Sequence, residues 1–299
     1  MKVVSLVVCL GVIGGVLGFP SRKSYEPVQL DYHGEVGIPR AALIRSAEAA
    51  ADFDGARIVG GQPAGLGAHP HIAGLLVSLT SGHTSMCGAS LLSNTKLVTA
   101  AHCWRTQQFQ GRSLVVVLGS ARLFSGGTRI TTTNVQLHAN YNQGNLNNDI
   151  AMITINRVGM NNNIRSISLP TGLLEYMTFV GNRATAVGYG RLQDGDSNND
   201  LLHQVSLIVI ENFVCTDIFG PSVIVDSTLC TSGQGRVGTC SGDSGGPLDF
   251  SFQGVRYLIG VTSFVSGRGC QVGMPAGFAR VTSFGSWIRA QKLFHILFQ

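Results

Sequence analysis

From Ile58 to Gln299 the sequence alternates between short apolar or β-branched runs and turns rich in glycine, asparagine and serine. Many short strands at regular spacing are typical of an antiparallel barrel or sandwich. The strands are expected at His71–Leu79, Ser113–Leu118, Thr128–Leu137, Asp149–Ile155, Ala184–Val187, Leu202–Ile210 and Tyr257–Phe264. The end of the chain differs, because Phe284–Gln299 carries apolar residues at helical spacing and predicts a helix packed on the barrel.

The first eighteen residues form a separate hydrophobic segment. Lys2 precedes the apolar run Val3–Val16, and the small Gly18 follows near the expected cleavage point. This order is typical of a secretory signal peptide. The run is short for a membrane span, and a short hydrophobic anchor is the alternative interpretation. Residues 1–18 are therefore predicted to be a signal that is removed on export.

The next segment, Phe19–Arg57, is charged in both signs and contains no cysteine. Pro39–Asp54 is rich in alanine, a good helix former, so a short helix is expected there. The segment has no alternating strands and no clear core of its own. We interpret residues 19–57 as a pro-segment and residues 58–299 as the functional domain.

The cysteines indicate an oxidising compartment. Of the seven, Cys9 lies in the predicted signal and leaves with it. The six that remain are Cys87, Cys103, Cys215, Cys230, Cys240 and Cys270. An even set in an exported chain predicts three disulfides, although the count alone leaves many pairings open. No Cys-x-x-Cys pair occurs among them, so a zinc ribbon is unsupported.

The charge argues against a nucleic-acid partner, because the formal net charge is only +5 and no block of Lys or Arg forms a stripe. From Ile58 onward the basic residues are arginines except for Lys96 and Lys292. Arginine keeps its charge at alkaline pH, where lysine begins to lose its proton. The bias favours an alkaline medium such as a gut lumen, with compositional drift as the alternative.

One motif points to a nucleophile. The run Gly242–Pro247 reads Gly-Asp-Ser-Gly-Gly-Pro and follows Cys240. A nucleophilic serine needs a tight, exposed backbone whose N–H groups face the substrate carbonyl, and glycines permit that geometry. Ser244 is therefore a candidate nucleophile, although Gly-Asp-Ser-Gly alone is also common in turns.

Two further motifs supply an imidazole and a carboxylate. Leu97–Cys103 surrounds His102 with small residues, which leave room for the ring to turn toward a partner. Asn148–Ala151 places Asp149 at the start of an apolar strand, where a buried carboxylate needs a hydrogen-bonding cation or imidazole N–H. Each residue alone is more often structural. Together their order is His102, Asp149, Ser244, which is the order of the chymotrypsin form of the triad.

With these motifs, the chain from Ile58 to about Ala290 resembles the trypsin/chymotrypsin family of serine proteases. Within that family, the sequence most resembles insect digestive chymotrypsins and collagenase-like proteases. The resemblance implies an all-β fold of two antiparallel six-stranded β-barrels with a C-terminal α-helix. It also implies a monomeric hydrolase that acts on protein or peptide substrates, needs no cofactor, and is a target of protein protease inhibitors.

The resemblance assigns catalytic roles. Ser244 would attack, His102 would take its proton and pass it to the leaving amine, and Asp149 would hold the imidazole. The N–H groups of Gly242 and Ser244 would form the oxyanion hole. The implied disulfides are Cys87–Cys103, Cys215–Cys230 and Cys240–Cys270.

The resemblance also implies activation by proteolysis. A trypsin-like protease would cut the motif Arg57–Gly61 after Arg57. The freed amine of Ile58 would then pair with Asp243, beside the nucleophile, and shape the oxyanion hole. Without that partner the site of the precursor would be malformed. The chain is therefore expected to be a zymogen.

The expected substrate pocket has an uncharged base at Gly238, so a preference for Arg or Lys is not expected. Val265 and Ala276 would form its walls and narrow it, and Ser263 would line the substrate backbone near Asp149. Both a chymotrypsin-like and an elastase-like preference for apolar residues remain open. The loop Gly119–Thr128, where the family binds calcium, has no Asp or Glu, so no metal site is predicted.

Other readings differ in function and not in fold. A catalytically silent homologue acting as a binding or regulatory protein would normally have lost a triad residue, and none is lost here. A regulatory protease of haemolymph or plasma would normally carry an accessory domain, and none is recognisable before Arg57. A secreted digestive protease, acting in the gut lumen, is the preferred prediction.

Overall fold

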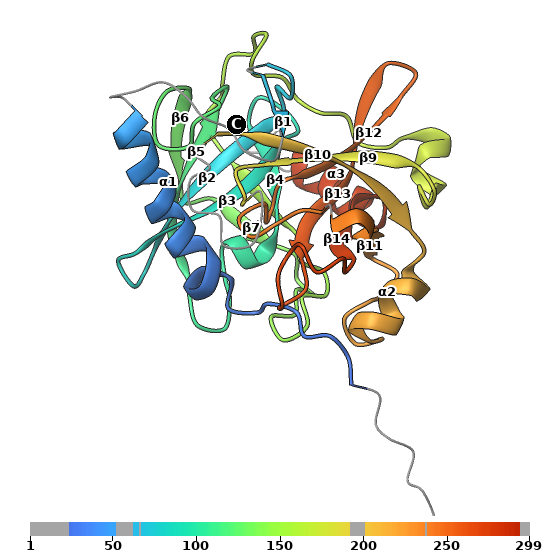
Figure 1. The fold of residues 1–299 in the computed structure, drawn as a ribbon. Helices are drawn as coiled ribbons and strands as arrows, with labels where there is room; N and C mark the ends of the chain where they lie inside the picture. The colour runs from blue at the N-terminus through green and yellow to red at the C-terminus, as the bar shows by residue number, and fades with distance from the viewer. Residues whose placement is uncertain (1–23, 52–61, 66, 192–200, 237, 294–299) are drawn as a thin grey trace, which may run out of the picture.

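The computed structural model describes residues 24–51, 62–65, 67–191, 201–236 and 238–293. The predicted signal, Arg57 and Ile58 lie outside this range. Two antiparallel sheets of seven strands each pack together, and Figure 1 shows them side by side. The predicted class, two β-barrels with a short C-terminal helix, is confirmed, although the strand count differs.

The first sheet has the order β6-β5-β2-β3-β4-β8-β7. Its strands are β2 (Ile72–Leu79), β3 (Thr84–Leu91), β4 (Lys96–Thr99), β5 (Gly111–Leu118), β6 (Thr128–Thr132), β7 (Val135–Leu137) and β8 (Ala151–Thr154). The run predicted as one strand at Thr128–Leu137 is divided at residues 133–134, because β6 pairs with β5 and β7 pairs with β8. This division gives seven strands where six were expected.

The second sheet has the order β1-β10-β11-β14-β13-β12-β9. Its strands are β1 (Gln62–Pro63), β9 (Arg183–Gly188), β10 (His203–Ile210), β11 (Thr228–Thr231), β12 (Pro247–Phe252), β13 (Val255–Phe264) and β14 (Ala276–Arg280). Pairing of β9 with β10 closes the strands β9 to β14 into a six-stranded barrel. The seventh strand, β1, is a two-residue edge on β10.

Alternating side chains fill each barrel. Leu75, Leu97 and Ile153 are fully buried in the first, and Leu248 and Ile259 are fully buried in the second. Two α-helices belong to this half of the chain: α2 (Asn212–Phe219) lies between β10 and β11, and α3 (Gly285–Leu293) follows β14. The predicted C-terminal helix is thus confirmed as far as the described residues extend.

The helix predicted in the pro-segment is also present, as α1 (Ile38–Ala51) after the π-helical turn η1 (His33–Gly37). The segment packs on the protease domain. Ala41 and Ile44 are buried with side chains of the first sheet in one apolar cluster. Figure 1 shows α1 along one side of that sheet and the preceding residues crossing toward α2.

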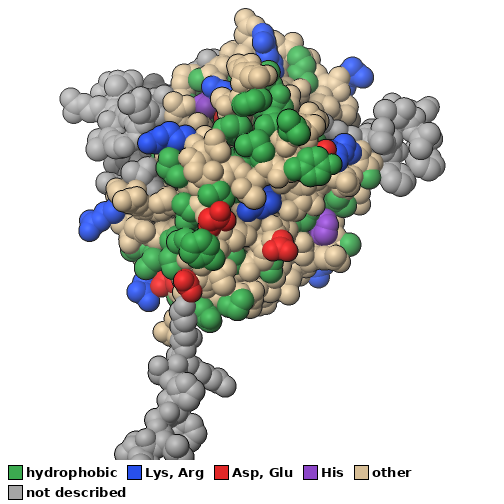
Figure 2. All heavy atoms as spheres, turned by 90° about the vertical axis from the view of Figure 1, so that its right-hand side faces the viewer, with side chains coloured by type: hydrophobic (Ala, Val, Ile, Leu, Met, Phe, Trp, Pro, Cys, Tyr) green, Lys and Arg blue, Asp and Glu red, His purple; other side chains and the backbone are tan. Residues whose placement is uncertain are grey.

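The surface carries scattered charges on the face shown in Figure 2, where the visible Lys and Arg side chains stand apart from one another. Among the described residues, no helix is long and apolar enough to cross a membrane.

Candidate active site

Strand pairing brings the imidazole to the carboxylate. His102 lies in the short 3-10 turn η2 (Ala101–Cys103) directly after β4, and Asp149 comes shortly before β8. In the β4–β8 ladder, Thr99 is opposite Ala151. His102 comes soon after Thr99, and Asp149 comes just before Ala151. The pairing therefore brings His102 and Asp149 together, although 47 positions separate them in sequence.

The Asp149 carboxylate holds His102 in two ways. Its Oδ2 accepts a hydrogen bond from the His102 Nδ1 at 2.6 Å, and its Oδ1 accepts one from the His102 backbone N–H at 2.8 Å. Ser263 Oγ donates to the same Oδ2 at 2.6 Å. Both His102 and Asp149 are buried. A buried carboxylate is stable only when paired in this way, and here the pairing turns the His102 Nε2 away from Asp149.

The Ser244 loop depends on glycines. Gly242 has φ +106° and Gly245 has φ +79°, both in the left-handed region that favours glycine. A side chain at Gly245 would collide with Thr99 Oγ1 and the carbonyl of Gly88. The Gly88 N–H also donates to the Ser244 carbonyl at 2.7 Å. These contacts hold the Ser244 loop, which belongs to the second barrel, against Gly88 and Thr99 of the first barrel.

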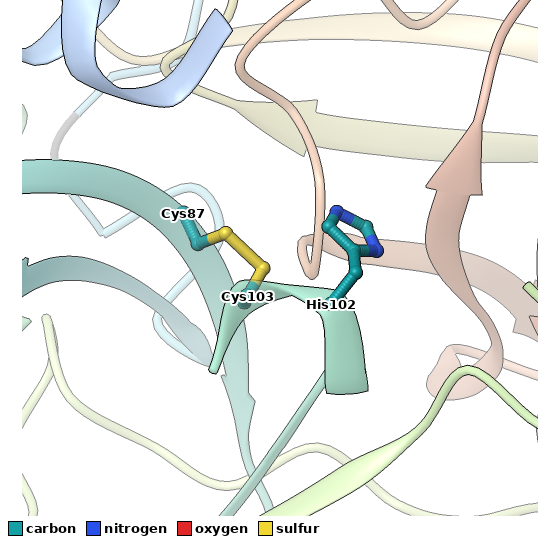
Figure 3. Close-up of side chains that lie close together, drawn as sticks. All are labelled: Cys87, His102 and Cys103. Atoms are coloured by element: carbon teal, nitrogen blue, oxygen red, sulfur yellow. A yellow bond between two sulfur atoms is a disulfide. The ribbon is translucent and has the colours of Figure 1, made fainter. Parts of the chain in front are cut away.

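The six cysteines outside the predicted signal pair as Cys87–Cys103, Cys215–Cys230 and Cys240–Cys270. These are the pairs that the resemblance implies. The first joins β3 to the η2 turn, and Figure 3 shows the His102 ring projecting away from its two sulfur atoms. Because both thiols are consumed in the disulfide, Cys87 and Cys103 are not metal ligands beside His102.

Asp243, the expected partner of the Ile58 amine, is partly buried. Its Oδ1 accepts from the Gly190 N–H and its Oδ2 from the Cys240 N–H, each at 2.9 Å. Burial raises the pKa of Asp243, and the two backbone hydrogen bonds and the nearby Arg40 charge only partly oppose that rise. The carboxylate therefore sits where a cation would stabilise it.

A cavity of about 210 Å³ opens beside Ser244. Ser263 and Val265, two of the predicted pocket residues, line it. Gly238 and Ala276 are not among its lining residues, although Val265 packs against the apolar cluster that contains Ala276. No acidic side chain lines this cavity among the described residues.

The residue that sequence reasoning missed is Tyr32 of the pro-segment. Its side chain is buried, its hydroxyl donates to the Met86 carbonyl at 2.8 Å, and its ring lies 4.8 Å from the His102 ring, edge to face. Burial raises the pKa of Tyr32, and the nearby Ser244 side chain opposes that rise only in part. No spacing in the sequence connects Tyr32 with the triad.

The hydrogen bond that links serine to histidine in an active triad is not made. His102 Nε2 is buried and has no hydrogen-bond partner among the described residues. Tyr32 and Ser244 line the same cavity. The expected hydrogen bond between Asp149 and His102 is therefore present, whereas the expected one between His102 and Ser244 is not.

A second buried cluster joins two histidines, an aspartate and an arginine, and no motif in the sequence predicts it. His69 and His71 lie 3.5 and 3.4 Å from Oδ2 of Asp249 on β12. The Arg256 Nη1 lies 2.6 Å from His69 Nδ1 and 3.9 Å from the same Oδ2. Burial alone would raise the pKa of Asp249, but the nearby His69, His71 and Arg256 bring it down to about 2. Arg256 supplies the positive charge that this carboxylate needs.

Comparison with known proteins gives a consistent assignment. The Trypsin family model matches residues 58–288. Collagenase from Hypoderma lineatum is 38% identical over 235 residues, covering 78% of this chain and 86% of the relative. Brachyurin from Leptuca pugilator is 35% identical, covering 78% of this chain and 98% of the relative.

The solved structure of HL collagenase shares the fold. It superposes with a TM-score of 0.72 at 37% sequence identity, covering 79% of this chain and 98% of that chain. Together with the barrel topology and the His102–Asp149 pair, these matches show that the chain belongs to the trypsin family of serine proteases and is a serine endopeptidase.

Proposed function

We propose that this endopeptidase cuts peptide bonds through the triad Ser244, His102 and Asp149. The observation that supports it best is the pair of hydrogen bonds from His102 to Asp149. Because Nδ1–H donates to the carboxylate, the neutral ring carries its lone pair on Nε2, the nitrogen that a general base needs. Ser244 lines the proposed substrate cavity.

In the proposed reaction, His102 Nε2 removes the Ser244 hydroxyl proton as Oγ attacks the substrate carbonyl carbon. The C–N bond then breaks, His102 gives the proton to the leaving amine, and water releases the acyl group by the reverse steps. Asp149 stabilises the imidazolium. The N–H groups of Gly242 and Ser244 stabilise the oxyanion, and the positive φ of Gly242 is compatible with that role.

The chain is made as a zymogen in this proposal, with residues 1–18 as signal, 19–57 as pro-segment and 58–299 as protease domain. A trypsin-like protease cuts after Arg57, and the Ile58 amine enters the Asp243 pocket. The support is the motif Arg57–Gly61 together with a partly buried carboxylate whose raised pKa makes a cation a favourable partner. The signal motif and three disulfides support secretion.

The substrate side chain is apolar, between a chymotrypsin-like and an elastase-like preference. Val265 lines the cavity, no lining residue is acidic, and Gly238 is uncharged, so the pocket has nothing to pair with Arg or Lys. Relatives include proteins named collagenase and brachyurin. Digestion of dietary protein in the gut lumen fits this broad apolar preference.

The test is labelling of the activated protein with a fluorophosphonate, followed by a peptide-library cleavage profile. Labelling that disappears in Ser244→Ala, an amino terminus at Ile58, and cleavage after apolar residues are the expected results. A protein that is cut after Arg57, freed of its pro-segment and still unlabelled would be a silent homologue. Cleavage mainly after Arg or Lys would overturn the pocket assignment.

A further inference from the structure

The pro-segment contacts the protease domain at three parts of the active site. Toward its beginning it forms an antiparallel bridge between Val28 and Ser266, and Gly267 N–H donates to the Pro27 carbonyl at 2.9 Å. Ser266 follows directly after Val265, so this backbone pairing lies along the edge of the proposed substrate pocket. A peptide substrate would need the same edge.

Side chains reinforce that first contact. The buried Glu26 accepts a hydrogen bond from Ser266 Oγ at 2.5 Å and forms an ion pair with Arg268 at 3.0 Å. Tyr32 and Gln29 line the cavity together with Val265. The pro-segment therefore borders this space without filling it, whereas a substrate would place a side chain in it.

The second contact acts on the triad itself. Tyr32 packs its ring against His102, its hydroxyl donates to the Met86 carbonyl, and it lines the cavity beside Ser244. The neighbouring His33 is buried, with Nδ1 2.7 Å from Ser85 Oγ. With Tyr32 packed here, His102 Nε2 has no hydrogen-bond partner among the described residues, so the path for a proton from Ser244 to His102 is not in place.

The third contact is at Asp243. Arg40 is fully buried, and its guanidinium donates to the carbonyl oxygens of Tyr189 and Gly190 at 3.2–3.3 Å. Gly190 is the residue whose N–H holds Asp243, and a side chain at Gly242 would meet Arg40 Cγ at 3.3 Å. The Arg40 charge therefore lies next to the carboxylate that the Ile58 amine requires.

The helix that carries Arg40 is anchored independently. Ile44 is fully buried among the first sheet's side chains. Glu48 Oε1 accepts from the N–H groups of Leu123 and Phe124 at 2.6 and 2.9 Å, and Oε2 accepts from Ser125 Oγ at 2.7 Å. These contacts persist whether or not the chain is cut after Arg57, since none of them depends on that bond.

We propose that the pro-segment is an inhibitor of its own protease domain, which stays bound after the cut at Arg57 and must leave before the enzyme is active. The proposal rests on the proposed triad and zymogen activation. Residues 19–57 contain no cysteine, so no disulfide holds the cut segment in place and its hold is non-covalent. Departure of Arg40 frees the Asp243 pocket for the Ile58 amine, and departure of Tyr32 restores the Ser244–His102 bond.

The test uses the full chain with residues 53–57 replaced by Asp-Asp-Asp-Asp-Lys, so that enteropeptidase frees Ile58 without cutting at Arg40 or Arg45. The kcat/KM for an apolar chromogenic peptide is measured on the cut protein at micromolar concentration. It is measured again after the pro-segment has been separated by size exclusion at high dilution, and once more after the pro-segment is added back.

The cut protein is expected to retain its pro-segment on size exclusion and to be at least about tenfold less active than the separated enzyme. Added pro-segment should restore the inhibition. Tyr32→Phe, which keeps the ring and loses the hydroxyl, should raise fluorophosphonate reactivity of the cut complex, and Arg40→Met should speed release. Ser46→Ala, an exposed change on the same helix, serves as the matched control and should alter neither property.

Full activity of a cut protein that still co-elutes with its pro-segment would overturn the proposal, as would immediate loss of the segment on cutting. Failure of the proposed function gives a different result, because the separated enzyme would then be inactive and unlabelled. In that case the comparison of pro-segment retention between Arg40→Met and Ser46→Ala still decides whether the docking contacts are real.

Discussion

The pH dependence of pro-segment binding is predicted from His33. This ring is buried against Ser85, and it faces Phe109 and His102 at the active-site end of the first barrel. Burial, together with the His102 charge, lowers the pKa of His33 from 6.5 to about 3. A released pro-segment would expose the ring and return its pKa to the usual range.

The sign follows from these two values. The bound ring stays neutral down to about pH 3, whereas the free ring takes up a proton below pH 6.5, and that proton stabilises the released state. The contribution of His33 to binding affinity is therefore fully present above pH 6.5 and is lost as the pH falls from 6.5 toward about 3. Within this window, each unit by which the pH falls weakens the free energy of binding by about 1.4 kcal/mol. At pH 4.5, protonation of the released His33 should therefore weaken binding about 100-fold.

The assay is fluorescence anisotropy of a labelled amino terminus on the cut full chain carrying Ser244→Ala, which prevents self-digestion. Dissociation is followed by dilution at each pH from 7.5 to 4, and the matched variant is His33→Asn. Other groups at the interface titrate in both proteins, so the difference between the two slopes belongs to His33. Equal slopes for the two proteins would refute the reasoning.

Three further predictions concern the catalytic site and its supports. Asp149→Asn keeps the shape of the site but favours the wrong imidazole tautomer, so kcat of the activated enzyme should fall by about 10⁴-fold with little change in the melting temperature. Ser263→Ala leaves the buried Asp149 with one hydrogen bond fewer and should lower the free energy of unfolding by about 1–3 kcal/mol, measured by urea denaturation; an unchanged midpoint would contradict this. Gly245→Ala should abolish fluorophosphonate labelling and lower the melting temperature, because the added carbon meets Thr99 and Gly88. The control is Gly254→Ala, which is also at positive φ but has open space around it. This variant should keep full labelling and lose only a little stability.

Much of the site was predictable from short motifs. Ser244, His102 and Asp149 each lie in a local pattern whose residue types serve their chemistry. The β4–β8 ladder, with Thr99 opposite Ala151, then places the last two side by side. The disulfide partners implied by the family resemblance are also those that the structure joins. Local sequence carries this information because strand register and turn geometry are set over a few residues.

Other features depend on long-range packing. The break between β6 and β7 follows from a change of pairing partner, which composition does not reveal. Asp249 joins His69 and His71 only because β12 passes beside the residues that precede β2. The width of the substrate pocket likewise depends on where Val265 lies relative to Ser244, and Gly238 and Ala276 do not line the cavity.

The sequence by itself determined the class of the chain and predicted the catalytic residues and the division into signal, pro-segment and protease domain, since each is carried by contiguous motifs or composition. Only the tertiary structure decided where the pro-segment lies. Its helix was predictable, but its position over the cleft arises from contacts of Tyr32 with His102 and of Arg40 with Tyr189 and Gly190. Contacts between residues so far apart in sequence leave no local periodicity, because they are selected by the fit of two folded surfaces.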